Sequence, residues 1–176
     1  MKKLGLRIVG WKQAILIPLG GIKYMGKYKP LAVCFDFNGV IVDHRSKKTI
    51  NGMEELIKDL HDNHVLLAIV SGSSSKIINR YLDKDLTTFF KRIFYSNKMN
   101  GGKIGCIKTF ALEYGLDLVD IAFVDDKPIN LKQLACSSAY VIGFARSGKY
   151  PTAQECYNLS IPVASSVEEL SRLLLN

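Results

Sequence analysis

Residues 31–43 of the chain are LAVCFDFNGVIVD, and this stretch determines the expected fold. Residues 31–35 are all apolar, and Asp36 follows them directly. A short run that is apolar at every position is typical of a strand buried on both faces, as in a parallel sheet covered by helices. Ligands of such sheets bind beyond the carboxyl ends of the strands. We therefore expect Asp36 at the ligand-binding edge of a sheet.

The rest of the chain repeats this pattern, with apolar runs separated by amphipathic segments. The segments between the runs carry apolar residues at helical spacing, as at Met53, Leu56, Ile57 and Leu60. Strands that alternate with helices predict an α/β fold with a central, mostly parallel sheet between layers of helices. Further strands are expected at residues 65–70, 92–95, 120–124, 140–144 and 161–164.

The expected helices are bounded by residues that commonly occupy helix ends. Ser and Asn side chains accept hydrogen bonds from first-turn N–H groups, Gly adopts the left-handed conformation after a helix, and Pro fits the first turn. The residues expected in these roles are Asn51 with Glu54 for the first helix, Ser73 or Ser74 for the second, Gly115 after the third, Pro128 in the fourth, and Ser165 with Glu168 in the last.

Polar residues stand where the buried strands are expected to end. Because the carboxyl ends of parallel strands meet at one edge of a sheet, these residues should lie together. Carboxylates suit Mg²⁺, a lysine balances the charge of a phosphoryl group, and a carboxylate oxygen can attack phosphorus. The pattern therefore predicts phosphoryl transfer with a divalent cation. The residues are Asp36, Ser71 with Gly72, Lys103, and Asp125 with Asp126.

Four segments resemble, in order, the four motifs of the haloacid dehalogenase superfamily. They are FDFNGVIVD at 35–43, IVSG at 69–72, the glycine-preceded Lys103, and FVDDKPINL at 123–131. The resemblance spans residues 31 to about 144 and is most specific in the first segment. It implies a Rossmann-like three-layer sandwich and a Mg²⁺-dependent phosphatase, of a subtype without a large cap domain.

What the resemblance implies is a set of catalytic roles for these residues. Asp36 would attack phosphorus and form an aspartyl-phosphate. Ser71, with Gly72, would bind the phosphoryl oxygens. Lys103 would offset the charge of nucleophile and phosphate. Lys98 is the alternative, because the lysine of this motif often precedes proline and Lys103 does not.

The resemblance also implies the metal ligands. Asp126, assisted by Asp125, would hold Mg²⁺ beside the carboxylate of Asp36, and Asn38 would contribute its backbone carbonyl. In similar phosphatases the residue at position 38 is usually an aspartate that protonates the leaving oxygen and later activates water. An amide cannot exchange that proton near neutral pH, and general acid–base catalysis typically contributes about 10²- to 10⁴-fold.

Two hypotheses follow from Asn38. One is a phosphatase that favours good leaving groups or recruits another group, such as Asp43, His44 or a substrate carboxylate. The alternative is a regulatory module that binds phosphate and Mg²⁺ without useful turnover. A phosphoacceptor receiver domain uses similar residues, but its acidic pair would precede the phosphoacceptor, whereas Asp125 and Asp126 follow Asp36.

The spacing of the motifs leaves no room for a cap domain. Ser71 lies 35 positions after Asp36, and Lys103 lies 32 positions after Ser71. A helix and a strand occupy nearly all of each interval. The site should be open, covered only by residues 43–50. Arg45, Lys47 and Lys48 in this segment either meet an anionic substrate or form a solvated turn.

The site alone does not decide what kind of substrate the protein takes. An open site suits a macromolecular phosphorylated substrate or a homo-oligomer in which a neighbouring subunit serves as the lid, and a small phosphorylated molecule is equally compatible with the sequence.

Composition limits the remaining classes. The 176 residues suit one domain, with 48% apolar and 23% charged residues, and no run approaches the roughly 20 apolar residues of a membrane-spanning helix. The four cysteines form no CxxC pair, and the three histidines share no ligand spacing. Structural zinc is therefore not expected, and free thiols favour a cytoplasmic location.

The net charge of +8 is concentrated at the N-terminus. Residues 1–30 contain seven basic residues and no acidic ones, so residues 31–176, the expected catalytic domain, are nearly neutral. The basic, apolar extension is expected to cover an edge or face of that domain, or to bind an anionic membrane surface through its lysines and Trp11. Arg7 and Lys12 interrupt its apolar stretch, which disfavours a secretory signal, and nucleic acid is disfavoured as a partner.

Overall fold

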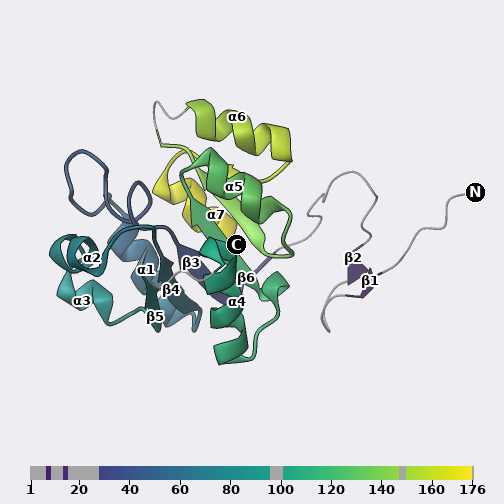
Figure 1. Cartoon of the computed structure of the whole chain (residues 1–176), viewed down its shortest axis with the longest axis horizontal. Coiled ribbons are helices and arrows are strands. Elements are labelled where there is room, and N and C mark those ends of the chain that lie inside the picture. Colours follow the sequence, from purple (N-terminus) through teal and green to yellow (C-terminus); the bar gives the residue numbers. More distant parts are fainter. Residues whose placement is uncertain (1–6, 9–13, 16–27, 96–100, 147–149, 176) are drawn as a thin grey trace, which may run out of the picture.

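The computed structural model describes residues 7–8, 14–15, 28–95, 101–146 and 150–175 (Figure 1). A six-stranded sheet forms the centre, and every pair of neighbouring strands in it is parallel. The strands are ordered β5-β4-β3-β6-β7-β8 across the sheet. Their bounds are β3 Ala32–Phe35, β4 Leu66–Val70, β5 Arg92–Phe94, β6 Ile121–Asp125, β7 Tyr140–Phe144 and β8 Val163–Ala164.

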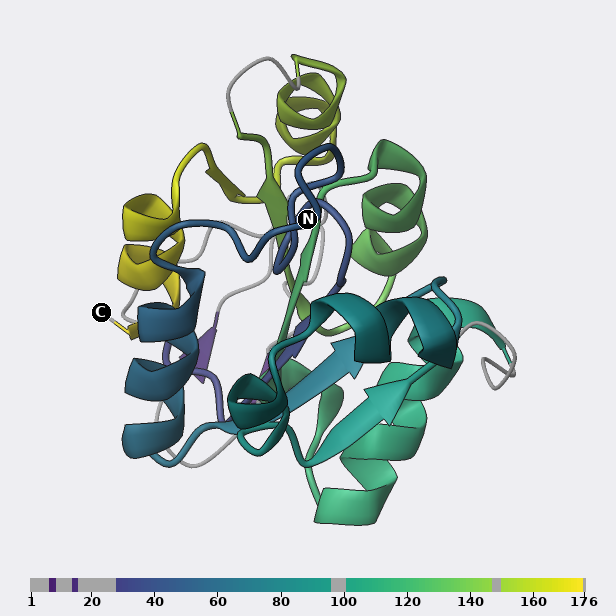
Figure 2. The same cartoon turned by 90° about the vertical axis from the view of Figure 1, so that its left-hand side faces the viewer.

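Helices cover both faces of this sheet, which gives three layers (Figure 2). Val33 and Phe35 of β3 pack in one core with residues of α1 and α7, whereas Ala32 and Cys34 pack in a second core with residues of α4, α5 and α6. This alternation confirms the predicted Rossmann-like α/β fold. The helices are α1 Met53–Asp62, α2 Ser75–Tyr81, α3 Lys84–Thr87, α4 Gly102–Tyr114, α5 Pro128–Ala135, α6 Tyr150–Leu159 and α7 Val167–Leu175.

The predicted cap of the first helix is wrong. Gly52, not Asn51, is the N-cap of α1, with φ of 82°. The N–H of Met53 donates to the carbonyl of Ile50, so the chain turns sharply just before the helix, and glycine adopts the required left-handed conformation at little cost. The carboxylate of Glu54 accepts from Lys58 instead of reaching back.

The predicted cap of the last helix is one residue too early. The Ser166 hydroxyl accepts from the N–H of Glu169 at 3.2 Å, and the Glu169 carboxylate accepts from the N–H of Ser165 at 2.7 Å. Val167, the first residue of α7, is buried, and this fixes the helix start one residue later than predicted.

Three other predicted helix ends agree with the structure in position. Gly115 follows α4 with φ of 65°, and Pro128 begins α5. Ser74 is the N-cap residue of α2, although its side chain makes no capping hydrogen bond. The short α3 was not predicted from the sequence.

Most of the N-terminal extension lies outside the described residues, and so do its predicted roles. Within it, β1 (Arg7–Ile8) pairs antiparallel with β2 (Ala14–Ile15). At the end of the extension, the Tyr28 hydroxyl donates to the carbonyl of Val119, and the centre of its ring lies 4.2 Å from that of Tyr140. The end of the extension therefore packs against the body.

At the carboxyl edge of the sheet, β4 and β6 lead into their helices through short connections, whereas β3 is joined to α1 by the longer segment 36–52. Between β3 and α1, the chain makes isolated bridges from Asn38 to Val42 and from Val42 to Thr49. No inserted domain separates the motifs in the parts of the chain that the structure describes. In those parts, too, no helix is long and apolar enough to span a bilayer.

The two edge strands are short. β8 has two residues and β5 has three. The exposed Arg92 of β5 lies 3.4 Å from the Glu113 carboxylate, and its guanidinium is 5.6 Å from the centre of the Phe94 ring. Most of the sheet's hydrogen-bonding groups therefore belong to the four inner strands.

We predict that Gly143→Ala destabilises the fold by about 1–3 kcal/mol, because an added Cβ in β7 would overlap the Sγ atom of buried Cys156. Cys156→Ala in the same chain removes that atom and should recover part of the loss. Urea unfolding of both single variants and the double variant measures the coupling, and strictly additive losses would contradict this account.

Candidate active site

The strand order brings two acidic segments together. Neighbouring strands β3 and β6 lead in opposite directions across the sheet, which makes the gap between their carboxyl ends a topological switch point, where ligands of such sheets bind. Phe35 pairs with Val124, and the N–H of Asp36 donates to the carbonyl of Val124 at 2.9 Å. Asp36 therefore leaves β3 beside Asp125, the last residue of β6.

Three carboxylates meet at this point. Asp36, Asp125 and Asp126 are all buried, and each offers an oxygen within 4.8 Å of the others. Like charges at this separation repel strongly in a medium of low dielectric constant. Such a cluster is stable only if cations or hydrogen-bond donors offset the charge.

Lys103 supplies a positive charge from the first turn of α4. Its ammonium lies 2.9 Å from Oδ1 of Asp36 and 2.6 Å from Oδ2 of Asp125. Burial lowers the pKa of Lys103, but the attraction of the two carboxylates outweighs it and leaves the pKa above its ordinary value. Lys103 is therefore charged at neutral pH, whereas Lys98 lies outside the described residues.

Both carboxylate oxygens of Asp125 accept hydrogen bonds. Besides Lys103, its carboxylate accepts hydrogen bonds from the backbone N–H of Lys127 at 2.8 Å and from the side-chain amide of Asn130 at 3.0 and 3.1 Å. Burial raises the pKa of Asp125, and the nearby lysine offsets part of that rise. These contacts suit Asp125 to positioning its neighbours.

Asp36 differs from Asp125 in its hydrogen bonding. Oδ1 of Asp36 contacts Lys103, but Oδ2 is buried and has no hydrogen-bond partner in the structure. A buried carboxylate oxygen without a partner is costly to maintain, and such groups commonly mark a binding or reactive site. The free oxygen of Asp36 is thus available to a cation or to phosphorus.

Asp126 is anchored by two elements distant in sequence. Its backbone carbonyl accepts from the buried Thr152 hydroxyl of α6 at 2.6 Å, and its Oδ2 lies 2.9 Å from Nε2 of His44. Gly39, with φ of 86°, permits this approach, since an added Cβ would overlap the Asp126 carboxylate and the His44 ring. His44 thus belongs to the acidic cluster and not to a free turn.

The remaining polar residues lie on the loops after β3 and β4. The Asn38 amide donates to the Ser73 hydroxyl at 2.6 Å, whereas its Oδ1 is buried without a hydrogen-bond partner. Ser71 is buried, and its hydroxyl accepts from the N–H of Ser73. Gly72 is exposed, as is Arg45, whose described contact is through its backbone N–H to Asp43.

A family model for haloacid dehalogenase-like hydrolases matches residues 36–141, which is more than half of the chain. The chain belongs to this family. No curated protein matches the hydrolase in sequence.

Solved structures share the fold of this haloacid dehalogenase-like hydrolase. A haloacid dehalogenase family hydrolase from Deinococcus radiodurans R1, with bound phosphate and sodium, has a TM-score of 0.70 at 16% identity and covers 84% of this chain and 99% of its own. The cobalt-bound deoxy-D-mannose-octulosonate 8-phosphate phosphatase of Haemophilus influenzae has a TM-score of 0.64 at 21% identity, covering 84% and 88%.

A third structure is more distant from the hydrolase. The 3-deoxy-D-manno-octulosonate 8-phosphate phosphatase of Moraxella catarrhalis, in complex with magnesium, phosphate and the KDO molecule, has a TM-score of 0.54 at 16% identity, and covers 72% of this chain and 75% of its own. At such identities these likenesses establish the fold alone.

Sequence reasoning missed several contacts of this hydrolase. Ser73 was considered only as a helix cap, and Thr152 was not considered, because it lies 26 residues from the Asp126 carbonyl that it contacts. The sequence offers His44 as a substitute proton carrier or as part of a solvated turn, and does not predict its contact with Asp126. The available signal was its position directly after Asp43, the last residue of the first motif.

We predict that Lys103→Met destabilises the metal-free hydrolase by about 3 kcal/mol at pH 7, because two buried carboxylates lose their counter-charge. A raised carboxyl pKa in the folded state favours folding at low pH, and this benefit disappears as pH rises through that pKa. The pKa of Asp125 should rise further in the variant, so the deficit should shrink between pH 7 and pH 5.

Urea unfolding in EDTA measures this difference. Lys108→Met is the matched control, because Lys108 is exposed on the same helix. A pH-independent deficit, or an equal loss in the control, would refute the charge-balance explanation.

Proposed function

We propose that this chain is a divalent-metal-dependent phosphatase that acts through an aspartyl-phosphate on Asp36. The observation that carries the proposal is the buried carboxylate of Asp36. One of its oxygens contacts the ammonium of Lys103, the other has no hydrogen-bond partner, and two further carboxylates lie beside it. The phosphate-bound and magnesium-bound neighbours of the same fold support it.

The residues at the site fit a hard divalent cation such as Mg²⁺. Such ions take oxygen ligands, and the cluster offers carboxylate oxygens of Asp36 and Asp126. We assign these two as ligands, with the backbone carbonyl of Asn38, and Asp125 as their support. When bound, the cation would neutralise charge on the carboxylates and on the phosphoryl oxygens.

The proposed reaction has two steps. An oxygen of Asp36 forms a bond to phosphorus while the bond from phosphorus to the ester oxygen breaks, and the ester oxygen leaves as an anion that takes its proton from solvent. A water oxygen then bonds to the phosphorus of the aspartyl-phosphate as the bond from phosphorus to Asp36 breaks. Solvent takes the proton of the water, inorganic phosphate is released, and the carboxylate is restored. Ser71 would donate its hydroxyl hydrogen to a phosphoryl oxygen, and the ammonium of Lys103 would stabilise the added negative charge.

Asn38 limits this reaction. Its amide donates a hydrogen bond to Ser73 and its Oδ1 only accepts, and an amide N–H is too weakly acidic to protonate a departing oxygen near neutral pH. Substrates whose leaving oxygen departs without protonation should therefore react faster than alkyl esters.

We predict that phosphate release from p-nitrophenyl phosphate requires both Mg²⁺ and Asp36. EDTA should abolish turnover, and Asp36→Asn should lower kcat by about 10³-fold or more, because the nucleophilic oxygen is lost. Asp59→Asn is the control, since Asp59 is exposed on α1. Full activity in EDTA or in Asp36→Asn would disprove the mechanism.

We further predict that Asn38→Asp raises kcat on an alkyl phosphate by about tenfold or more, and on an aryl phosphate by less. The geometry should persist, because the Ser73 hydroxyl can donate to a carboxylate as readily as it accepts from the amide. Stopped-time phosphate release with phenyl phosphate and glycerol phosphate compares the two classes. Equal wild-type rates on both would contradict the leaving-group argument.

A further inference from the structure

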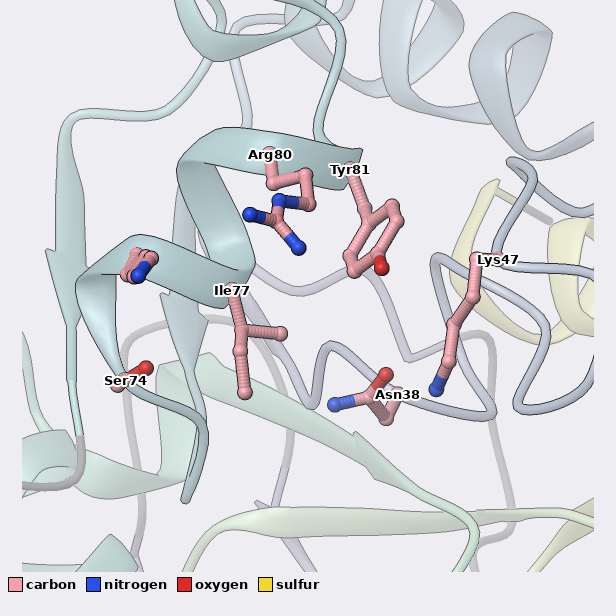
Figure 3. A pocket seen from close by; sticks show the side chains of 7 residues that line it. Asn38, Lys47, Ser74, Ile77, Arg80 and Tyr81 are labelled. Atoms are coloured by element: carbon pink, nitrogen blue, oxygen red, sulfur yellow. The ribbon is translucent and has the colours of Figure 1, made fainter.

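A pocket of about 450 Å³ opens beside Asn38 (Figure 3). In that view Ile77, Arg80 and Tyr81 extend into it from α2, while Asn38 and Lys47 approach from the opposite side. Ser74 and Lys76 complete the lining. Because Asn38 follows the proposed nucleophile by two residues, the pocket adjoins the phosphoryl site.

The pocket is strongly cationic. Lys47, Lys76 and Arg80 line it, and no acidic residue is among the lining residues. None of the three cations takes part in an ion pair within the described residues. Three positive charges around one pocket repel one another and attract an anion, which would supply the missing counter-charge.

The loop that carries Lys47 is held in place. Lys47 has φ of 57°, an uncommon conformation for a residue with a side chain, and its N–H donates to the carbonyl of Asp43. Hydrogen bonds from the backbone N–H groups of Ser46 and Arg45 lower the pKa of Asp43 to about 2, and Arg146 contacts the same carboxylate at 3.2 Å. These contacts hold the turn that places Lys47 at the pocket.

The opposite wall is partly apolar. Ile77 is 41% exposed although it is a large aliphatic residue, and the half-buried Tyr81 lies beside it in Figure 3. Such a wall can pack against the carbon skeleton of a small molecule while the cations bind its charged end. The volume suits a sugar-sized ligand.

We propose that this pocket selects the substrate, and that the substrate is a small phosphate monoester with a second anionic group, a carboxylate or a phosphate, held by Lys47, Lys76 and Arg80. This inference rests on the proposed phosphatase function, since it places the reacting phosphate at Asp36. The guanidinium of Arg80 suits planar, two-point contact with either anion.

Three six-carbon substrates test the proposal with the full-length protein and Mg²⁺. Glucose 6-phosphate has no second anion, 6-phosphogluconate adds a carboxylate, and glucose 1,6-bisphosphate adds a phosphate. We expect kcat/KM for at least one of the two substrates with a second anionic group to exceed that for glucose 6-phosphate by about tenfold. The preferred substrate identifies the anion.

Variants locate the source of the preference. The double variant Lys76→Gln and Arg80→Gln should bring the ratio of kcat/KM values close to one. The ratio is the measured quantity, so a loss of folded protein cannot imitate the effect. The double variant Lys108→Gln and Lys132→Gln removes the same charge from exposed positions outside the pocket and should keep the wild-type ratio.

The outcomes distinguish failure of the pocket assignment from failure of the phosphatase proposal. Equal kcat/KM on the three sugars, together with hydrolysis of p-nitrophenyl phosphate, would overturn the pocket assignment and leave the phosphatase proposal intact. If no ester is hydrolysed, the phosphatase proposal fails, and calorimetric titration of Asp36→Asn with glucose 1,6-bisphosphate and glucose 6-phosphate decides the pocket. About tenfold tighter binding of the bisphosphate supports it, and equal or absent binding overturns it.

Discussion

The buried ammonium of Lys103, shared between Asp36 and Asp125, is the interaction on which the site depends. It lets two carboxylates remain close together in a region from which water is largely excluded, where an uncompensated pair would be strongly destabilising. It also distinguishes the two oxygens of Asp36, because one is occupied and the other has no hydrogen-bond partner. The reactivity that we assign to Asp36 follows from this asymmetry.

The sheet topology makes this interaction possible. The chain crosses the sheet in one direction after β3 and in the other after β6, so the loops from the two strands diverge and leave space between their starting points. The space is bounded by the short segment that contains His44 and Lys47. Without a large inserted domain in the described residues, this segment and α2 form the nearest walls of the site.

Most of the fold and the acidic centre could be predicted, because both follow from local pattern. Asp36, which follows one buried strand, and Asp125, which ends another, must lie close together if the two strands are parallel neighbours. The contacts of His44 with Asp126 and of Asn38 with Ser73 depend on the paths of loops, which no periodicity encodes. The predicted cap of the first helix was wrong for the same reason, since Gly52 is needed only because the chain turns there.

The short edge strands constrain how copies of this protein could associate. A second molecule that added a strand to the sheet would find three residues to pair with at β5 and two at β8. At β5, the charged side chain of Arg92 forms an ion pair with Glu113. A charged side chain on an edge strand disfavours strand pairing between molecules and the aggregation that can follow from it. The margins of this six-stranded sheet, as far as the structure describes the chain, therefore offer little backbone for pairing with a second molecule.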